Sequence, residues 1–125
     1  MSTYTIAVID DDEVSLELIA HVIESELDAQ VISFTRSAFA KEFLMHQTNT
    51  SLDIIVSDMV MPEYDGLALL RACREKGLSV PFIFMTAFAS RQTEVLAKQL
   101  GAVAYLVKPI RRDKLVSLLK QQLTK

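Results

Sequence analysis

The sequence predicts an α/β protein: a doubly wound (βα)5 fold of three layers, in which helices cover both faces of a parallel five-stranded sheet. Five apolar segments alternate with five segments whose apolar residues recur at helical spacing. The first, third, fourth and fifth strand segments are nearly continuous apolar runs, which is typical of parallel strands buried on both faces. Acidic, hydroxyl or cationic residues follow these four runs, and open α/β sheets place their sites at the carboxyl ends of strands.

Each expected element is a short segment with its own apolar pattern. The expected strands are residues 4–9, 30–34, 53–57, the run 82–85 that Pro81 opens, and 103–107. Five helices are expected. Three of them are marked by apolar stripes: Leu18, Ile19, Val22, Ile23 and Leu27 in the first, Phe39, Ala40, Phe43 and Leu44 in the second, and Leu115, Val116, Leu119 and Leu123 in the fifth. The third helix is expected over 66–76 and the fourth between Ser90 and Gly101.

Glycine, proline and serine mark the ends of these elements. Pro62 and Gly66 punctuate the loop after the third strand. Gly77 is placed to end the third helix in a left-handed conformation, and Gly101 to end the fourth. Ser90 is expected to cap the fourth helix at its amino end.

Length and composition fit one compact domain. The chain has 125 residues, half of them apolar, which is enough for a core without disulfides or metals. No linker, repeat or low-complexity segment divides it, so we expect residues 1–125 to form a single domain. The one cysteine, Cys73, falls on a helical apolar pattern and is expected to pack. No apolar run approaches the ~18 residues of a membrane span, and no secretion signal is present, so we expect a cytoplasmic protein.

Charge is distributed unevenly along the chain. The net charge is only −3, yet residues 1–65 hold 13 acids and 2 bases, whereas residues 66–125 hold 3 acids and 11 bases. The basic carboxyl-terminal segment lacks interleaved aromatic residues and any nucleic-acid-binding motif. We therefore interpret it as a solvated helix face, with no direct contact to nucleic acid or membrane.

The residues that follow the strands describe a phosphoryl site. Asp10, Asp11 and Asp12 follow the first strand, Asp58 the third, Thr86 the fourth, and Lys108 the fifth. Parallel strands would bring these side chains to one edge, where carboxylates suit Mg²⁺ and a lysine suits phosphate oxygens. The chain has only three glycines and no glycine-rich first turn, which argues against a dinucleotide cradle.

Four motifs occur in a fixed order along the chain. They are V-I-D-D-D at the first strand, I-V-S-D-M-V-M-P-E-Y-D-G around the third, M-T-A at the fourth and Y-L-V-K-P at the fifth. With these motifs and spacings, the chain from Thr5 to Leu123 resembles the receiver domains of bacterial response regulators. The resemblance implies a flavodoxin-like strand order 2-1-3-4-5 and a phosphorelay receiver with Asp58 as phosphoacceptor.

The resemblance also implies a Mg²⁺ site beside the phosphoacceptor. Asp11, Asp58 and the backbone carbonyl of Val60 would bind the ion directly, and Asp10 would orient a water bound to it. A solvated loop is the ordinary explanation for adjacent acids, and it covers Asp12. It does not explain why Asp10 and Asp11 reach the same edge as Asp58, since crowded carboxylates repel unless a cation or proton intervenes.

Three further roles follow from the resemblance. Lys108, through a cis bond to Pro109, would pair with the phosphoryl oxygens. Thr86 would hydrogen-bond the phosphoryl group, and Tyr105 would be a second switch element that changes rotamer. Taken alone, Lys108 would be an ordinary surface lysine and Thr86 an ordinary strand residue.

The implied partners are signalling proteins. A sensor histidine kinase or a histidine phosphotransfer protein would supply the phosphoryl group. The surface of the fourth helix, fifth strand and fifth helix would act on a downstream output domain or protein, and we expect no output domain within this chain. The domain would not be an enzyme beyond its own phosphorylation from a phosphodonor and slow autodephosphorylation.

Two local features of the sequence lead to further expectations. Ala102-Val103-Ala104 lacks acidic residues with which some DNA-binding members of the family form a dimer, so we expect an acidic partner or a different dimer. Val60 and Phe88 are apolar where, by resemblance, side chains border the path of a hydrolytic water, so we expect a long-lived phosphorylated state. The alternative for Phe88 is that it packs under the fourth helix.

Two other functions fit parts of the sequence. Residues 10–14 match the D-x-D-x-V motif of haloacid-dehalogenase-type phosphatases, with Asp10 as nucleophile. That fold needs a later acidic pair, and only Asp113 follows Lys108. The second alternative is an adaptor that is never phosphorylated, although such relatives lose acids or the lysine that are all present here. His21 and His46 lack metal-ligand companions and are expected on helix surfaces.

Overall fold

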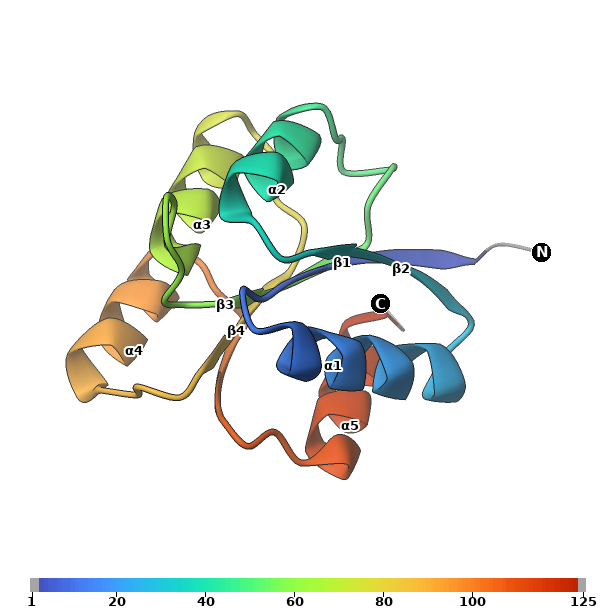
Figure 1. The fold of residues 1–125 in the computed structure, drawn as a ribbon. Helices are drawn as coiled ribbons and strands as arrows, with labels where there is room; N and C mark the ends of the chain where they lie inside the picture. Colours follow the sequence, from blue (N-terminus) through green and yellow to red (C-terminus); the bar gives the residue numbers. More distant parts are fainter. Residues whose placement is uncertain (1–2, 124–125) are drawn as a thin grey trace.

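The computed structural model describes residues 3–123, in which five strands alternate with five helices (Figure 1). The strands are β1 (Tyr4–Ile9), β2 (Ala29–Phe34), β3 (Ile54–Asp58), β4 (Phe82–Thr86) and β5 (Ala104–Val107). The helices are α1 (Glu13–Glu26), α2 (Ser37–Met45), α3 (Gly66–Glu75), α4 (Arg91–Gln99) and α5 (Arg112–Leu123). All strand pairs are parallel and the order is β2-β1-β3-β4-β5, which confirms the expected fold class and strand order.

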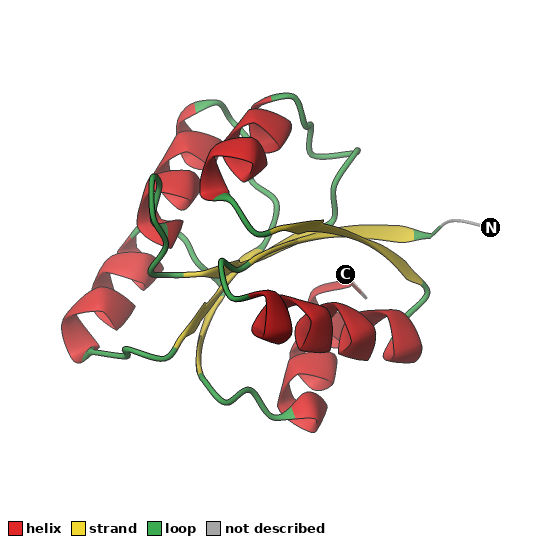
Figure 2. Ribbon diagram, in the orientation of Figure 1, coloured by secondary structure: helices red, strands yellow, loops and turns green. Residues whose placement is uncertain are grey.

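Helices form an outer layer on each face of the twisted sheet (Figure 2). α1 and α5 cover one face, where Ile19, Ile23 and Leu119 pack against Ile6 and Ile83. α2, α3 and α4 cover the other, where the packed side chains include Leu44, Leu69, Cys73, Phe84 and Ala97. Cys73 is fully buried as expected, and burial raises the pKa of its thiol to about 11. No helix in the described range 3–123 is long and apolar enough to cross a membrane.

Two apolar residues that were expected in the core are exposed instead. Leu18 on α1 is 62 % exposed and Phe39 on α2 is 57 % exposed. The buried stripe of α1 is Leu16, Ile19 and Ile23, which follow one another at three and four residues. Leu18 lies next to that stripe in sequence but on another side of the helix. Core packing therefore does not account for these two large apolar side chains.

The edge strand β5 also departs from the expected burial. β5 pairs only with β4, and Val107 is 54 % exposed, so the apolar run of β5 is not buried on both faces. The boundary residues behave as expected, because Gly77 and Gly101 have φ of 88° and 99° and the Ser90 side chain accepts from the amide of Thr93. His21 and His46 are exposed, also as expected.

Gly66 fixes the distance between α3 and the end of β3. Its amide donates to the Met59 carbonyl at 2.9 Å. A Cβ atom at this position would lie 2.5 Å from the carbonyl oxygen of Asp58 and 2.6 Å from the ring of Phe84. Neither atom can move freely, since one belongs to a buried strand and the other to the core. Only glycine therefore lets the helix begin this close to Asp58.

Replacing Gly66 with alanine should lower the free energy of unfolding by about 1–3 kcal/mol, the usual cost of overpacking a core. It should also shift the backbone amide resonances of Asp58 and Met59. Gly77→Ala is the control, because a Cβ there meets no atom within 4 Å and only the left-handed backbone opposes it. Urea unfolding and NMR spectra measure both effects, and an unchanged stability in Gly66→Ala would contradict the close approach.

Candidate functional site

The residues that follow the strands meet at one end of the sheet. Asp10 follows β1, Asp58 ends β3, Thr86 ends β4 and Lys108 follows β5. The Lys108 ammonium donates to Asp10 Oδ2 at 2.7 Å and to Asp58 Oδ2 at 3.0 Å. Side chains separated by 98 and 50 positions in the sequence are thus joined by one cation. The expected convergence at the carboxyl edge is confirmed.

Three carboxylates form a cluster around this point. Asp10, Asp11 and Asp58 each place a carboxylate oxygen within 4.8 Å of the others. Asp10 and Asp58 are buried, whereas Asp11 is exposed and open to solvent on one side. A set of hard oxygen donors with one open side fits a small divalent cation such as Mg²⁺, which prefers oxygen ligands and keeps several waters.

Burial and charge act in opposite directions on this cluster. Burial raises the pKa of Asp58; the Lys108 ammonium opposes the rise and the negative Asp10 adds to it, so the pKa lies above its ordinary value. Burial also acts to raise the pKa of Asp10, but hydrogen bonds from Lys108 and the Asp12 amide outweigh burial and lower it. For Lys108, burial lowers the pKa, and the two carboxylates outweigh this so that the pKa is raised. The hydrogen bonds and the Lys108 charge therefore compensate the cost of burying ionised Asp10 in full, but that of Asp58 only in part.

The two expected switch residues face the same side of the sheet. Thr86 is fully buried, and its hydroxyl accepts from the Phe88 amide at 3.0 Å, which leaves its proton for another acceptor. Tyr105 is half-buried on β5 and pairs with Phe84, two residues before Thr86. The Tyr105 hydroxyl lies 2.7 Å from Thr93 Oγ1 and accepts from the Ser90 amide, at the start of α4. β5 and α4 are thereby tied together close to Thr86.

The side chains at the mouth of the site are apolar and exposed. Val60 is 53 % exposed, and its amide faces Asp58 Oδ1 at 3.4 Å. Phe88 is 75 % exposed, so it does not pack under α4. The Lys108–Pro109 bond is cis, as expected.

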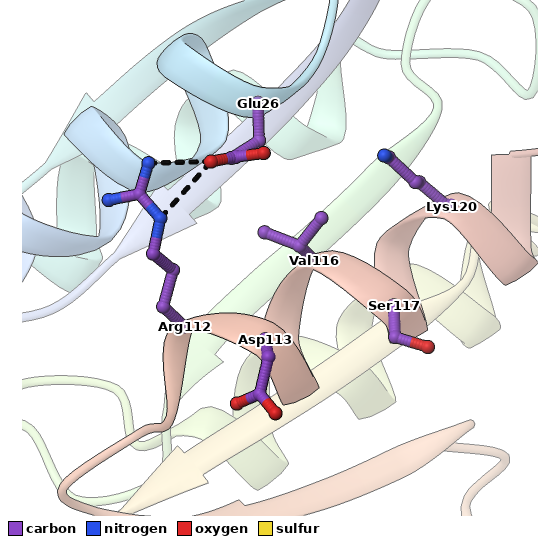
Figure 3. Close-up of a pocket in the computed structure, with 6 residues that line it drawn as sticks. All are labelled: Glu26, Arg112, Asp113, Val116, Ser117 and Lys120. Atoms are coloured by element: carbon purple, nitrogen blue, oxygen red, sulfur yellow. Dashed lines mark hydrogen bonds and ion pairs between the residues drawn. The ribbon is translucent and has the colours of Figure 1, made fainter.

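Hollows in the surface lie both beside the site and away from it. A groove of ≈ 430 Å³ adjoins Lys108, and its walls include Val14, Leu18, Pro109 and Ile110. The sequence does not predict this groove, because the apolar pattern of the first helix places Leu18 in the core. A second hollow of ≈ 490 Å³ lies between α1 and α5, where Arg112 pairs with Glu26 (Figure 3). None of the residues expected at the site lines that second hollow.

The sequence profile of the response regulator receiver domain matches residues 6–120. The chain therefore belongs to the response regulator receiver domain family, a class of phosphorelay receivers in two-component signalling. The family assignment excludes the haloacid-dehalogenase alternative. The geometry agrees, because Asp10 is fully buried and held by Lys108 and the Asp12 amide rather than presented as a nucleophile.

Several known proteins resemble the chain. The DNA-binding transcriptional regulator NtrC of Klebsiella pneumoniae is 36 % identical over 117 residues, which are 94 % of this chain and 24 % of that protein. The chain thus spans about a quarter of the length of such relatives. An uncharacterized 14.6 kDa protein of Leptolyngbya boryana is 33 % identical over 93 % of this chain and 87 % of its own length. The crystal structure of a receiver domain protein from Clostridium thermocellum has a TM-score of 0.87 and 25 % identity, covering 96 % and 94 % of the two chains.

Replacing Asp58 with asparagine should stabilise the metal-free protein, by about 1 kcal/mol. Because folding raises the pKa of Asp58, its ionised form destabilises the folded state above the ordinary aspartate pKa, and a neutral amide removes that penalty. Mg²⁺ should then stabilise the wild-type protein more than Asp58→Asn. Urea unfolding with Mg²⁺ and with a chelator tests both statements, with exposed Asp12→Asn as control. A marked loss of stability in metal-free Asp58→Asn would contradict the electrostatic account.

Proposed function

We propose that this domain accepts a phosphoryl group on Asp58 from a sensor histidine kinase or a histidine phosphotransfer protein. The observation that carries the proposal is the position of the Lys108 ammonium, which lies within hydrogen-bond distance of two members of the carboxylate cluster, Asp10 and Asp58. A cation between two carboxylates at a strand edge neutralises charge where a phosphoryl group would add more. The family membership supports the same assignment.

The transfer exchanges one bond to phosphorus for another. A carboxylate oxygen of Asp58 attacks the phosphorus of a phosphohistidine, the phosphorus–nitrogen bond breaks, and the imidazole leaves with the electron pair. The product is an acyl phosphate on Asp58. Lys108 then pairs with one phosphoryl oxygen, and the Thr86 hydroxyl donates a hydrogen bond to another. The signal ends by hydrolysis: water attacks the phosphorus, the bond between phosphorus and the Asp58 oxygen breaks, and the carboxylate and inorganic phosphate are released.

Asp11, Asp58 and the Val60 carbonyl would hold Mg²⁺, with Asp10 orienting a bound water. When bound, the ion would neutralise the charge that develops on the phosphoryl oxygens. Asp10 and Asp58 are fixed by Lys108, which keeps the negative charges close together before any donor arrives. Beyond this transfer and a slow hydrolysis, the domain is proposed to have no enzymatic activity.

The proposed output surface is formed by α4, β5 and α5. Movement of Thr86 toward the phosphoryl group would free Tyr105 to change its contacts with Ser90 and Thr93, which biases a two-state element. Val95, Val103 and Val107 are exposed on this surface, and Val107 lines a hollow together with the basic residues Arg111 and Lys114. An acidic output domain or protein suits this combination.

The groove beside Lys108 is proposed to receive the phosphodonor. A donor must place its phosphoryl group at Asp58, so the side chains around its histidine must contact the rim of the site. Leu18 and Val14 are exposed there, next to Pro109 and Ile110. An apolar segment bearing the phosphohistidine would cover these side chains on docking.

Acetyl phosphate and Mg²⁺ should label Asp58 alone, and Asp58→Asn should abolish labelling because the nucleophile is lost. Intact-mass and peptide mass spectrometry measure the modification. Asp12→Asn, at the neighbouring exposed acid, should label as the wild type does. Labelling that persists in Asp58→Asn would refute the assignment, and a wild-type protein that takes no label would favour the adaptor alternative.

Leu18→Glu should slow transfer from protein donors about tenfold, equivalent to ~1.4 kcal/mol, because a charge in the groove opposes apolar docking. Transfer from acetyl phosphate should be unchanged. Phe39→Glu is the matched control, since Phe39 is 57 % exposed against 62 % for Leu18 but lies on α2. Autophosphorylated kinases of the host serve as donors, and equal slowing by the two variants would argue against the groove.

Replacing Val60 with Asn and Phe88 with Glu should raise the dephosphorylation rate about tenfold, which is ~1.4 kcal/mol of barrier. Polar side chains can hold a water in line with the phosphorus–oxygen bond, whereas the exposed valine and phenylalanine exclude it. Decay of labelled protein at saturating Mg²⁺ gives the rate. A double variant that folds and decays at the wild-type rate would show that these side chains do not control the water.

A further inference from the structure

A buried hydroxyl holds the loop that follows Asp58. Ser37, the first residue of α2, is 1 % exposed. Its Oγ donates to the Pro62 carbonyl at 2.6 Å and accepts from the Tyr64 amide at 3.0 Å. Both partners lie in the segment 59–65 between β3 and α3, more than twenty positions away in sequence. One side chain thus binds two peptide groups of this loop at once.

The residue between those two peptide groups has an unfavourable backbone conformation. Glu63 has φ of 72° and is the only non-glycine residue with positive φ among residues 3–123. A side chain makes this backbone conformation unfavourable, so surrounding contacts must enforce it. The Glu63 carboxylate also pairs with Arg36 at 3.1 Å, but both side chains are largely exposed and such pairs contribute little. Of the polar contacts around Glu63, the two hydrogen bonds of the buried Ser37 hydroxyl are therefore the stronger constraint.

The same loop carries a proposed ligand of the metal. Its two ends are fixed near the core, since the Met59 amide donates to the Met85 carbonyl and the Gly66 amide donates to the Met59 carbonyl. Residues 60–64 lie between these bonds, where Met61 packs in the core and Val60 is exposed. A hollow of ≈ 230 Å³ is lined by Asp11, Arg36, Ser37, Pro62 and Glu63 together with Thr35. The contact made by Ser37 therefore borders the acidic cluster through Asp11.

We propose that Ser37 is a positioning residue for the cation and phosphoryl site. By holding Glu63 in its left-handed conformation, it fixes the path of residues 59–65 and places the Val60 carbonyl relative to Asp11 and Asp58. This inference rests on the proposed function, because it concerns the Mg²⁺ site assigned there. The sequence does not predict this role, because Ser37 lies in none of the motifs or apolar stripes.

Ser37→Ala removes the hydroxyl and leaves the Pro62 carbonyl and the Tyr64 amide without their partner. We expect faster hydrogen exchange at the Tyr64 amide in the absence of metal, and Mg²⁺ affinity about tenfold lower by calorimetry, ~1.4 kcal/mol. Labelling by acetyl phosphate at a fixed, subsaturating Mg²⁺ concentration should fall with the affinity and recover when Mg²⁺ is raised.

A second substitution separates positioning from general loss of stability. Glycine adopts positive φ without penalty, so Glu63→Gly in the Ser37→Ala background should restore most of the Mg²⁺ affinity. Glu63→Gln is the matched control, because it removes the ion pair to Arg36 but keeps the unfavourable backbone, and it should not restore affinity. If Ser37→Ala does not fold, the Ser37→Ala/Glu63→Gly double variant should fold and bind Mg²⁺.

The outcomes distinguish this inference from the proposed function. If the wild-type protein neither binds Mg²⁺ nor labels at Asp58, the proposed function fails. If the wild type does both, and folded Ser37→Ala binds Mg²⁺ within about twofold of wild type, then Ser37 does not position the site. Rescue by Glu63→Gln as complete as rescue by Glu63→Gly, or a double variant that remains unfolded, would likewise overturn the link between Ser37 and Glu63.

Discussion

The pairing of Lys108 with Asp10 and Asp58 is the interaction on which the site depends. Two buried carboxylates at neighbouring strand ends repel each other, and removing either from water costs several kcal/mol without a partner. The lysine comes from the far edge of the sheet, so the full β1-β3-β4-β5 arrangement must form before the charges are compensated. The opposite pKa shifts of Asp10 and Asp58 show that compensation is unequal. One carboxylate is satisfied by the protein, and the other retains a preference for further positive charge, which is the property a cation and phosphoryl site requires.

The loop that follows β3 is held by specific contacts in addition to the packing of Met59 and Met61 in the core. Gly66 lets α3 start against the Asp58 carbonyl, and Ser37 binds the next turn of the same loop from α2. Both contacts come from the α2–α3 side of the sheet. On the opposite side, Leu18 and Pro109 leave an open apolar groove beside Lys108. The site is therefore held firmly on one side and accessible on the other, which suits the proposed approach of a protein donor.

The sequence predicted the fold and the meeting of the charged residues because both follow from periodic patterns. Continuous apolar runs define buried parallel strands, and residues at their carboxyl ends must share an edge. The same reasoning was wrong for Leu18 and Phe39, since an apolar stripe gives the side of a helix only to within one residue. It was also wrong for β5, whose apolar residues lie at an edge. The role of Ser37 could not be predicted, because its bonds to Pro62 and Tyr64 depend on loop geometry. Glu63 lies in the motif that follows the third strand, but nothing in that motif indicates its backbone conformation. Gly66 was recognised only as a turn residue, since close approach to Phe84 is a property of the packed core.

The position of β5 suits the proposed transmission of phosphorylation at Asp58 to the surface. β1, β3 and β4 are paired on both sides and almost wholly buried, so displacing them would disrupt the core. β5 pairs on one side only, and Val107 and Tyr105 reach toward solvent. It is nevertheless joined to the site at Lys108, whose amide donates to the Thr86 carbonyl at 2.8 Å. Its hydrogen bonds to the start of α4 come from the Tyr105 hydroxyl, which can exchange partners without creating a cavity. Elements with few buried contacts are the ones that move at low cost. The edge strand and α4 are therefore the part of this fold that can respond to a charge at Asp58 while the buried strands stay in place.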